Sequence, residues 1–422
     1  MTVHKVIKTK GLIDGTGAPK KEYMAIVIQD HTIIEIGTLT SVHIPDHAEI
    51  IDLGDKTVLP GLVDAHMHFF AIPSHELYKM HTESTEYRAI RGAEEAGKML
   101  QAGITAARCL GSNVTPTIRR AINEGLIPGP RMVAAGNFII STSGTWDDIT
   151  PAHEFADGKE EVRKRVRQRI SQGADVIKIG LSKGALGDLN VSWGDDPYTN
   201  LPAYSLEETK AITEEAHFNH VKVSAHCIGE DAVNLAIDGN VDVIEHGYAI
   251  SQETRMRLVE TQIPVVTTMS QLYFHEQAFE PFHYSQQEKE LFTKHYQAMK
   301  ESFCKGLEAG VHFVLGTDLI GYPTHPQDQA AKEWELVVEL GMTPEQAIVA
   351  GTKLAADVIG LGDKVGTIEK GKYADIIAVE GDPIEDISRL QFVDFVMKDG
   401  EVVKKDRGNK RAIYSSDNES QS

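Results

Sequence analysis

The sequence predicts an α/β protein, in which a (β/α)8 TIM barrel is accompanied by a small β-domain that both chain ends build. Two observations predict this fold. Short apolar runs alternate with amphipathic helical stretches through the middle of the chain. Segments rich in β-branched residues and broken by Gly and Asp turn signals occupy both flanks.

The middle of the chain contains eight strand candidates, separated by helical patterns such as 86–103, 159–173 and 205–219. Eight strands alternating with helices over about 300 residues suit a single barrel. A doubly wound open sheet is the alternative, but it would usually carry a glycine-rich phosphate turn after its first strand, and none follows 64–68. The candidates span 58–68, 104–110, 131–139, 175–180, 222–227, 242–247, 264–269 and 312–318.

The two ends of the chain have similar strand-like sequence patterns. Strand-like stretches read at 6–17, 23–37 and 48–60, and the pattern returns at 365–381 and 395–405. We therefore expect both ends of the chain to pair in one β-domain.

Composition excludes several classes of partner. The chain has 422 residues and a formal net charge of -20, which repels nucleic acid and anionic membranes. No apolar run is long enough to span a bilayer, and the first residues lack the apolar region of a secretion signal. Three cysteines, Cys109, Cys227 and Cys304, fit neither a disulfide framework nor a zinc-thiolate site, so we expect buried thiols in a cytoplasmic protein.

Ionisable side chains fall at the carboxyl ends of the predicted strands, where barrel enzymes place their functional groups. Residues i and i+2 of a strand point the same way, so the two histidines of the first strand can face one metal ion. The set comprises His66 and His68 on the first strand, Lys178 on the fourth, His226 on the fifth, His246 on the sixth and Asp318 on the eighth.

Each member of this set also has an ordinary explanation. A lone histidine at a strand end is usually a satisfied polar residue, and Asp318 alone would cap the helix that follows. Lys178 alone would be a surface or snorkelling lysine in most proteins, but apolar neighbours flank it in a strand expected to be buried on both faces. A buried lysine must lose its charge, find a partner or be modified. The joint pattern is far harder to attribute to chance.

The chemistry of these groups points to a pair of divalent metal ions, with zinc the first choice. Neutral imidazole and carboxylate are ligands of such ions. Two metals together lower the pKa of a shared water and polarise a carbonyl. No carboxylate on the fourth strand bridges them, but a carbamylated Lys178 would supply one. Asp318 would then bind metal and act as the general base.

At this point the sequence resembles the metal-dependent amidohydrolase superfamily, and within it the branch of imidazolonepropionase-related and Xaa-Pro dipeptidase-like enzymes. The resemblance covers about residues 5–405 and rests on an ordered set of runs: LPGLVDAHMH, LQAGITAARCLG, EGLIPGPRMVAAG, GADVIKIG, YSLEETKAITEEAH, SAHCIG, IEHG, GTD, ELGMTPEQAIVAGT and GTIEKGKYADIIAVEGDPIEDI.

The resemblance implies a binuclear centre. His66, His68 and Asp318 would hold the first metal, His226 and His246 the second, and carbamylated Lys178 would bridge them. It also implies a β-sandwich domain over 1–58 and 360–410, a barrel over 59–359 and a polar tail over 411–422. Homo-oligomers are common among such enzymes.

The sequence departs from the dipeptidase pattern after strands two, three and five. After strand two, a common RDLG reads RCLG, with Cys109 in place of the aspartate. The glycine-rich TGGHGD run after strand three reads TSGTWD here, so Thr145 replaces the histidine and Trp146 enters. Ile228 stands where a second histidine often follows strand five. These changes exchange polar groups for apolar surface. They weaken the case for an ordinary dipeptide and favour an apolar or aromatic amide, urea or carbamate.

We therefore expect a hydrolase that cleaves an amide-type C–N bond in a dipeptide, an N-acyl amino acid or an aryl amide, urea or carbamate. Ring opening of a cyclic amide and a non-catalytic binding protein on the same barrel are the alternatives. Residues that could line the substrate pocket are Tyr248, His325, Trp146 and Tyr322.

Overall fold

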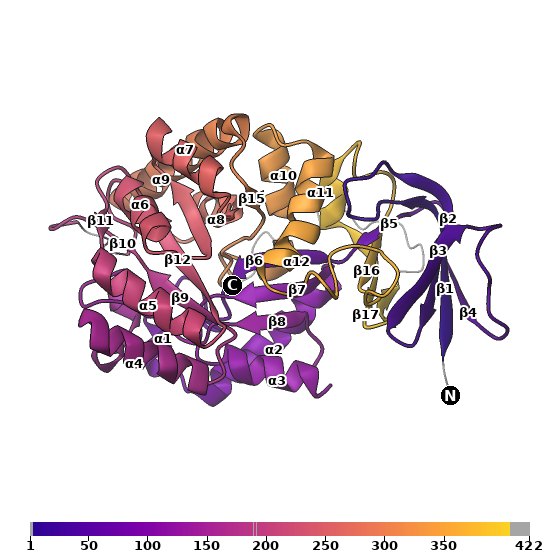
Figure 1. Cartoon of the computed structure of the whole chain (residues 1–422), viewed down its shortest axis with the longest axis horizontal. Coiled ribbons are helices and arrows are strands. Elements are labelled where there is room, and N and C mark those ends of the chain that lie inside the picture. Colours follow the sequence, from indigo (N-terminus) through magenta and orange to yellow (C-terminus); the bar gives the residue numbers. More distant parts are fainter. Residues whose placement is uncertain (1–2, 189, 191, 406–422) are drawn as a thin grey trace, which may run out of the picture.

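A computed structural model describes residues 3–188, 190 and 192–405. The polar tail expected over 411–422, with 406–410 of the predicted C-terminal β-segment, lies outside the described residues. Figure 1 shows two parts, an α/β part and a β-rich part in which the first strands of the chain lie beside its last ones.

The β-rich part is one sheet that both chain ends share, as the strand-like flanks predicted. Its strand order is β18-β17-β16-β5-β1-β2-β3, with β4 paired to β1. The two ends meet where β5 pairs antiparallel with β16. The strands are β1 (His4–Leu12), β2 (Lys21–Gln29), β3 (Thr32–Thr38), β4 (Glu49–Asp52), β5 (Thr57–Pro60), β16 (Ile376–Val379), β17 (Val393–Lys398) and β18 (Glu401–Lys405).

The α/β part contains two parallel sheets, of order β6-β7-β8 and β15-β14-β13-β12-β9. Each predicted strand range of the middle region overlaps one of these strands. They are β6 (Leu62–Met67), β7 (Ile104–Cys109), β8 (Arg131–Ala134), β9 (Val176–Gly180), β12 (Lys222–Ile228), β13 (Val243–Tyr248), β14 (Val265–Val266) and β15 (Phe313–Val314). A small pair, β10 (Ser182–Lys183) and β11 (Leu201–Pro202), follows β9.

Backbone contacts join the two parallel sheets at both of their edges. At one edge, Ile139 bridges Ile179 beside β9. At the other, the segment after β15 bonds to β6, and Asp318 N donates to His66 O over 2.7 Å. Gly316 makes this second approach possible, because a Cβ there would lie 2.6 Å from His66 N. The arrangement is a barrel-like α/β fold.

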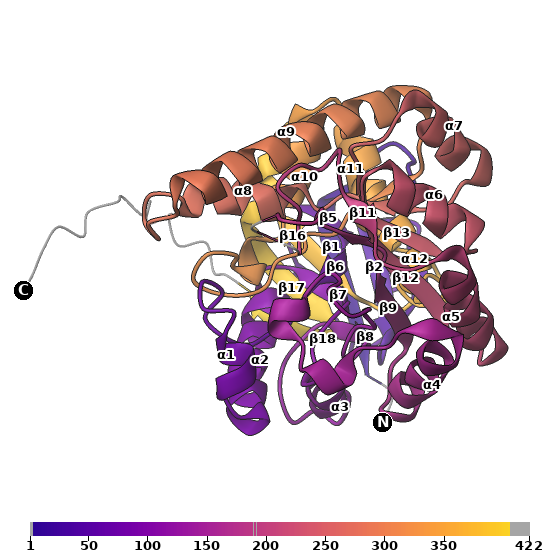
Figure 2. The ribbon, with the colours of Figure 1, turned by 90° about the vertical axis from the view of Figure 1, so that its left-hand side faces the viewer.

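Helices surround these strands, as Figure 2 shows. The three helical patterns expected from the sequence form α2, α4 and α5, and α5 begins with a capping box between Ser205 and Glu208. The helices are α1 (Lys79–Thr82), α2 (Thr85–Gln101), α3 (Thr115–Asn123), α4 (Gly158–Ser171), α5 (Leu206–Phe218), α6 (Glu230–Asp238), α7 (Gln252–Thr261), α8 (Met269–Ala278), α9 (Gln286–Ala309), α10 (Lys332–Glu339), α11 (Pro344–Ala350) and α12 (Lys353–Val358), with short 3-10 turns at Asp147–Ile149, Ala152–Glu154, Gln327–Gln329 and Ile387–Gln391.

The first predicted strand is wrong as a single element. Residues 58–68 divide at Gly61 into β5, which belongs to the shared sheet, and β6, which pairs with β7. A Cβ at Gly61 would lie 2.0 Å from the Thr105 hydroxyl, so only glycine lets the chain pass from one sheet to the other here. The range 131–139 is also too long, since β8 ends at Ala134.

The cysteines are free thiols, as expected, although Cys304 is only partly buried rather than fully so. Among the described residues, no helix combines the length and apolar character that crossing a membrane requires.

Candidate metal centre and cavity

Six ionisable side chains from five strand ends converge at the carboxyl edge of the parallel strands. All six are at least nine-tenths buried. Ligand atoms of three of them, His66, His246 and Asp318, lie within 4.8 Å of one another. The set consists of His66 and His68 around the end of β6, Lys178 on β9, His226 on β12, His246 on β13 and Asp318 after β15.

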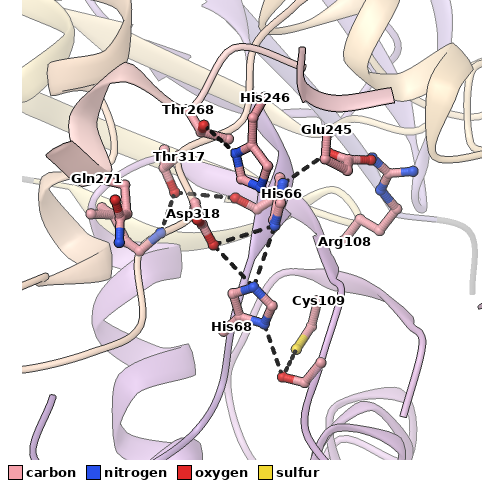
Figure 3. Close-up of polar contacts among 12 residues, drawn as sticks. His66, His68, Arg108, Cys109, Glu245, His246, Thr268, Gln271, Thr317 and Asp318 are labelled. Carbon is pink, nitrogen blue, oxygen red and sulfur yellow. Dashed lines mark hydrogen bonds and ion pairs between the residues drawn. The ribbon is translucent and has the colours of Figure 1, made fainter. Parts of the chain in front are cut away.

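Asp318 joins the two histidines of the first strand. Its Oδ1 lies 3.0 Å from His68 Nε2 and 3.3 Å from His66 Nε2, and these two nitrogens are 3.3 Å apart (Figure 3). Asp318 has a φ of 56°, in the left-handed region, as does His246 with 71°. Such strain persists only where surrounding contacts hold it, and it concentrates at functional sites.

Hydrogen bonds from behind fix which nitrogen of each ring faces the centre. His68 Nδ1 donates to the Gly111 carbonyl over 3.1 Å, which leaves Nε2 with a lone pair toward Asp318. His246 Nδ1 lies 2.9 Å from the Thr268 hydroxyl (Figure 3). Partners of this kind orient imidazoles for metal binding.

A buried ion pair supports His66. Its Nδ1 lies 2.8 Å from Glu245 Oε2, and the other oxygen of Glu245 lies 2.7 Å from Arg108 Nη2. Arg108 also donates from Nε to the Ala65 carbonyl. Burial alone would raise the pKa of Glu245, but Arg108 and His66 together hold this pKa well below its usual range. A permanent carboxylate therefore stands behind His66.

Lys178 and His226 differ from the other members. Lys178 Nζ and both ring nitrogens of His226 are buried without a hydrogen-bond partner among the described residues. Lys178 Nζ lies 5.7 Å from the centre of the Trp146 ring, and burial lowers the pKa of Lys178 to about 8. An unpaired buried polar atom is costly, so these atoms fit ligands that are added to the chain.

The charge states suit metal binding. Burial lowers the pKa of His68, His226 and His246, so these rings are neutral at pH 7 and keep a lone pair. Burial would raise the pKa of Asp318, but the neighbouring His66 holds it well below its usual range. The centre therefore offers neutral imidazoles, one carboxylate and one amine.

A cavity of about 410 Å³ opens over this centre. His68, His226 and Asp318 line its floor, and aromatic side chains form much of its wall. No lysine or arginine is among the described residues that line it. The aromatic wall consists of Phe70, Trp146, Trp193, Phe282, Tyr284 and Phe292.

The sequence profile of the Amidohydrolase family matches residues 57–403. Ochratoxinase from Aspergillus niger is 33% identical over 93% of this chain and 85% of its own. The chain belongs to the amidohydrolase family. A Xaa-Pro dipeptidase structure with bound methionine aligns with a TM-score of 0.84 at 32% identity, covering 94% of this chain and 99% of its own. The structure of A. niger ochratoxinase aligns with a TM-score of 0.84 at 28% identity, covering 96% of each chain.

Membership confirms the predicted family and the predicted enzyme class, a hydrolase acting on C–N bonds. It also agrees with the barrel-like α/β fold. The non-catalytic alternative finds no support in these relatives.

Of the four residues expected to line the substrate pocket of this amidohydrolase, only one lines the cavity. Trp146 lines the cavity, whereas the other three do not. Tyr248 is buried with its hydroxyl 2.7 Å from His295 Nδ1. His325 is buried against Thr324, and its Nε2 donates to the Gln271 carbonyl. The Tyr322 hydroxyl donates a hydrogen bond to Asp328.

The sequence departures also lie mostly behind the cavity wall. The Thr145 hydroxyl donates to the Ser182 carbonyl, and neither Thr145 nor Ile228 lines the cavity. Of these positions, Trp146 alone carries apolar surface to the cavity.

Sequence reasoning missed several cavity residues. Trp193 belongs to the segment between β10 and β11, and Gln271 and His275 lie on α8. These residues could have been found by their position, because they lie in segments that follow the predicted strands, where barrel enzymes bind ligands.

Proposed function

We propose that this amidohydrolase is a two-metal enzyme that hydrolyses amide bonds with an apolar or aromatic group beside the scissile carbonyl. The observation that carries the proposal is Lys178 Nζ, buried without a partner beside His226, whose ring nitrogens also lack one. Both residues fit a metal pair that only a carbamylated lysine completes.

The ligand set follows from this fit. His66, His68 and Asp318 would hold one ion, His226 and His246 the other, and the carbamate of Lys178 would contribute to both. Carbamylation joins the neutral amine to carbon dioxide and releases one proton. The lowered pKa of Lys178 favours the neutral amine that this step requires. Zinc suits these nitrogen and oxygen donors.

When bound, the two ions would polarise the scissile carbonyl and lower the pKa of a water. The chain's own residues do the rest. Asp318 Oδ1, fixed between His66 and His68, would take the proton of the attacking water and return it to the leaving amine. Glu245 and Arg108 keep the His66 ring in place from behind.

The cavity supports an aromatic substrate. Its wall offers several aromatic rings against which an aromatic substrate would pack. Aromatic pairs of this kind gain about 0.5–1.5 kcal/mol beyond burial of their area. The proposed substrates are N-acyl amino acids and aryl amides. Dipeptides, ureas and carbamates are the next candidates, and ring opening of a cyclic amide is the alternative reaction.

The proposal includes the finer expectations from the sequence. The parallel strands would close into one (β/α)8 barrel over 59–359, and the shared sheet would form a β-sandwich over 1–58 and 360–410. The enzyme would act in the cytoplasm as a homo-oligomer.

Two measurements test the proposal. Protein produced with zinc and bicarbonate should contain about two ions per chain, and chelation should abolish amide hydrolysis. After exchange with 13C-bicarbonate, the NMR spectrum should contain a carbamate resonance that Lys178→Ala lacks. A metal-replete protein that cleaves none of the amides in a screen, or one that binds no metal, would contradict the proposed function.

A further inference from the structure

The helix that follows strand β14 begins differently from several others in the protein. Helices α5, α7 and α9 start after a serine whose hydroxyl accepts a hydrogen bond from the third residue of the helix, namely Ser205, Ser251 and Ser285. Thr268 occupies the same position before α8, but within the described residues its hydroxyl accepts no bond from that helix. Because the first backbone N–H groups of a helix have no partner inside it, α8 needs an acceptor from elsewhere.

Glu333 on α10 supplies this acceptor. Met269 N donates to Glu333 Oε1 over 2.9 Å, and Ser270 N donates to Glu333 Oε2 over 2.7 Å. Met269 and Ser270 are the first two residues of α8. The Thr267 hydroxyl also donates to Oε1. Glu333 is 0% exposed, so its carboxyl group makes these bonds in the protein interior, where hydrogen bonds are stronger than in water.

Because Glu333 caps α8, the Thr268 hydroxyl can serve another residue. Thr268 Oγ1 lies 2.9 Å from His246 Nδ1 (Figure 3). In the proposed metal centre His246 binds through Nε2, so Nδ1 carries the ring proton and donates it to the threonine oxygen. Capping of α8 therefore does not compete with the contact that orients His246.

Glu333 also fixes the backbone on both sides of Thr268. Thr268 has a φ of 71° and a ψ of 32°, in the left-handed region, where a β-branched residue is strained. Its N–H donates to the Gly316 carbonyl over 3.0 Å. Glu333 holds Thr267 by its hydroxyl and Met269 by its backbone N–H. A strained residue persists only where its surroundings hold it, so Glu333 sustains the direction of the Thr268 side chain.

The position of Glu333 is itself set by packing. Its neighbour Lys332 lies with Nζ 4.8 Å from the centre of the Tyr273 ring on α8. Its other neighbour, Trp334, is 0% exposed. The first turn of α10 is thus anchored on both sides of Glu333, and the carboxyl group has little freedom to move away from α8.

From these contacts we infer that Glu333 is a positioning residue of the candidate metal centre. By accepting the hydrogen bonds that begin α8, it leaves the Thr268 hydroxyl to orient the His246 ring. Glu333 is not among the described residues that line the cavity, so it acts through Thr268 and not on the substrate. The inference rests on the proposed two-metal function and assigns a role in metal affinity to a buried carboxyl group on α10.

Glu333→Gln tests this role in the full-length enzyme, with zinc as the probe. An amide nitrogen replaces one carboxyl oxygen and cannot accept, so a backbone N–H of α8 loses its partner. The Thr268 hydroxyl is then drawn to the start of the helix, and one of the two zinc ions should bind about 10-fold more weakly. Competition with a chromophoric chelator measures the affinity. Glu339→Gln, at an exposed position of α10, is the matched control and should bind both ions normally.

A double-mutant cycle with Thr268→Val separates positioning from a general loss of structure. Valine has no oxygen for His246, so the contact that Glu333 supports is already absent in this background. Adding Glu333→Gln to Thr268→Val should therefore change zinc affinity by less than about 2-fold. If Glu333 only stabilised the fold, the two losses of affinity would multiply.

Thr267→Val decides the question if Glu333→Gln does not fold. This variant removes one of the three hydrogen bonds that Glu333 accepts and keeps the two bonds to the backbone of α8. It should cause a smaller loss of zinc affinity than Glu333→Gln, and again only when threonine is present at position 268.

The outcomes are distinct. Unchanged zinc affinity in Glu333→Gln, or in Thr267→Val if Glu333→Gln does not fold, would overturn the inference. An equal loss with and without the Thr268 hydroxyl would overturn it as well. The proposed function would survive these results, because the unmodified enzyme would still bind two zinc ions and cleave amides. An unmodified enzyme that binds no zinc would instead contradict the proposed function itself.

Discussion

On one side of the candidate metal centre, Nδ1 of His68 and Nδ1 of His246 each form a hydrogen bond with the protein. Nδ1 of His66 lies beside the Glu245 carboxylate. On the other side, Lys178 and His226 have no such partner within the described residues. The first side is complete without any addition. The second has buried polar atoms without a partner, which is costly unless the group changes its charge or gains a ligand. The proposed carbamylation of Lys178 and the proposed metal pair would account for this difference.

The largest effect is expected from Lys178→Ala. Removing the amine removes the proposed carbamate, so the ion at His226 and His246 should be lost and kcat/KM should fall by roughly 10³-fold or more. Metal analysis and steady-state kinetics measure both quantities. Lys222→Ala, at the exposed amino end of β12, is the control and should retain both. A Lys178→Ala variant with full metal content would place the comparison between the two sides in doubt.

The completed side should respond in its stability rather than in its chemistry. Arg108→Met leaves the Glu245 carboxylate buried with one partner fewer, which should lower the free energy of unfolding by about 3–5 kcal/mol. Urea denaturation measures this loss. Arg120→Met on the exposed face of α3 is the matched control. Equal midpoints for the two variants would mean that the ion pair behind His66 is not needed for folding.

The hydrogen bond behind His246 should tune metal affinity. Thr268→Val keeps the shape of the side chain but removes the oxygen near His246 Nδ1, so zinc affinity should fall by about 10–100-fold. Competition with a chromophoric chelator measures the change. Thr268→Ser keeps a hydroxyl and should recover most of the affinity. If Val and Ser behave alike, the hydroxyl does not orient the ring.

The sequence predicted which strand-end side chains converge better than it predicted which side chains line the cavity, and the reason is geometric. The carboxyl ends of parallel strands meet at one edge, so His66, Lys178 and Asp318 could be brought together from strand positions alone. Tyr248 follows His246 on the same strand, yet its hydroxyl contacts His295 and the side chain does not line the cavity. The contacts of a side chain at the end of a strand depend on distant helices, and no strand pattern encodes them.

The same holds for the fold. Alternation of strands and helices located the parallel strands, and the composition of the flanks predicted one shared sheet. The division of 58–68 at Gly61 escaped prediction, because it depends on the close approach of Thr105, which is remote in sequence. Trp193 and Gln271 were missed for a similar reason, since their relation to the centre exists only after the chain has folded.

The smallest effect concerns a buried group outside the centre. Glu95 on α2 is also buried, and its Oε2 has no partner within the described residues, but burial raises its pKa to about 8. Glu95 avoids a buried charge by keeping its proton, whereas we propose that Lys178 is carbamylated. Because the unfolded carboxyl titrates near 4.5, the folded state binds the extra proton between about pH 4.5 and 8. Stability should therefore fall as pH rises through this window.

Glu95→Gln removes that titration. The variant should gain on the order of 1–2 kcal/mol relative to the unmodified enzyme between pH 5 and pH 8, since water and relaxation reduce the full linkage value. Urea denaturation at the two pH values measures the gain, and the exposed Glu94→Gln provides the control on the same helix. An unchanged pH dependence would mean that Glu95 is ionised in the folded protein and has a partner. The absence of a hydrogen-bond partner would then no longer be a feature that sets Lys178 and His226 apart from other buried polar groups.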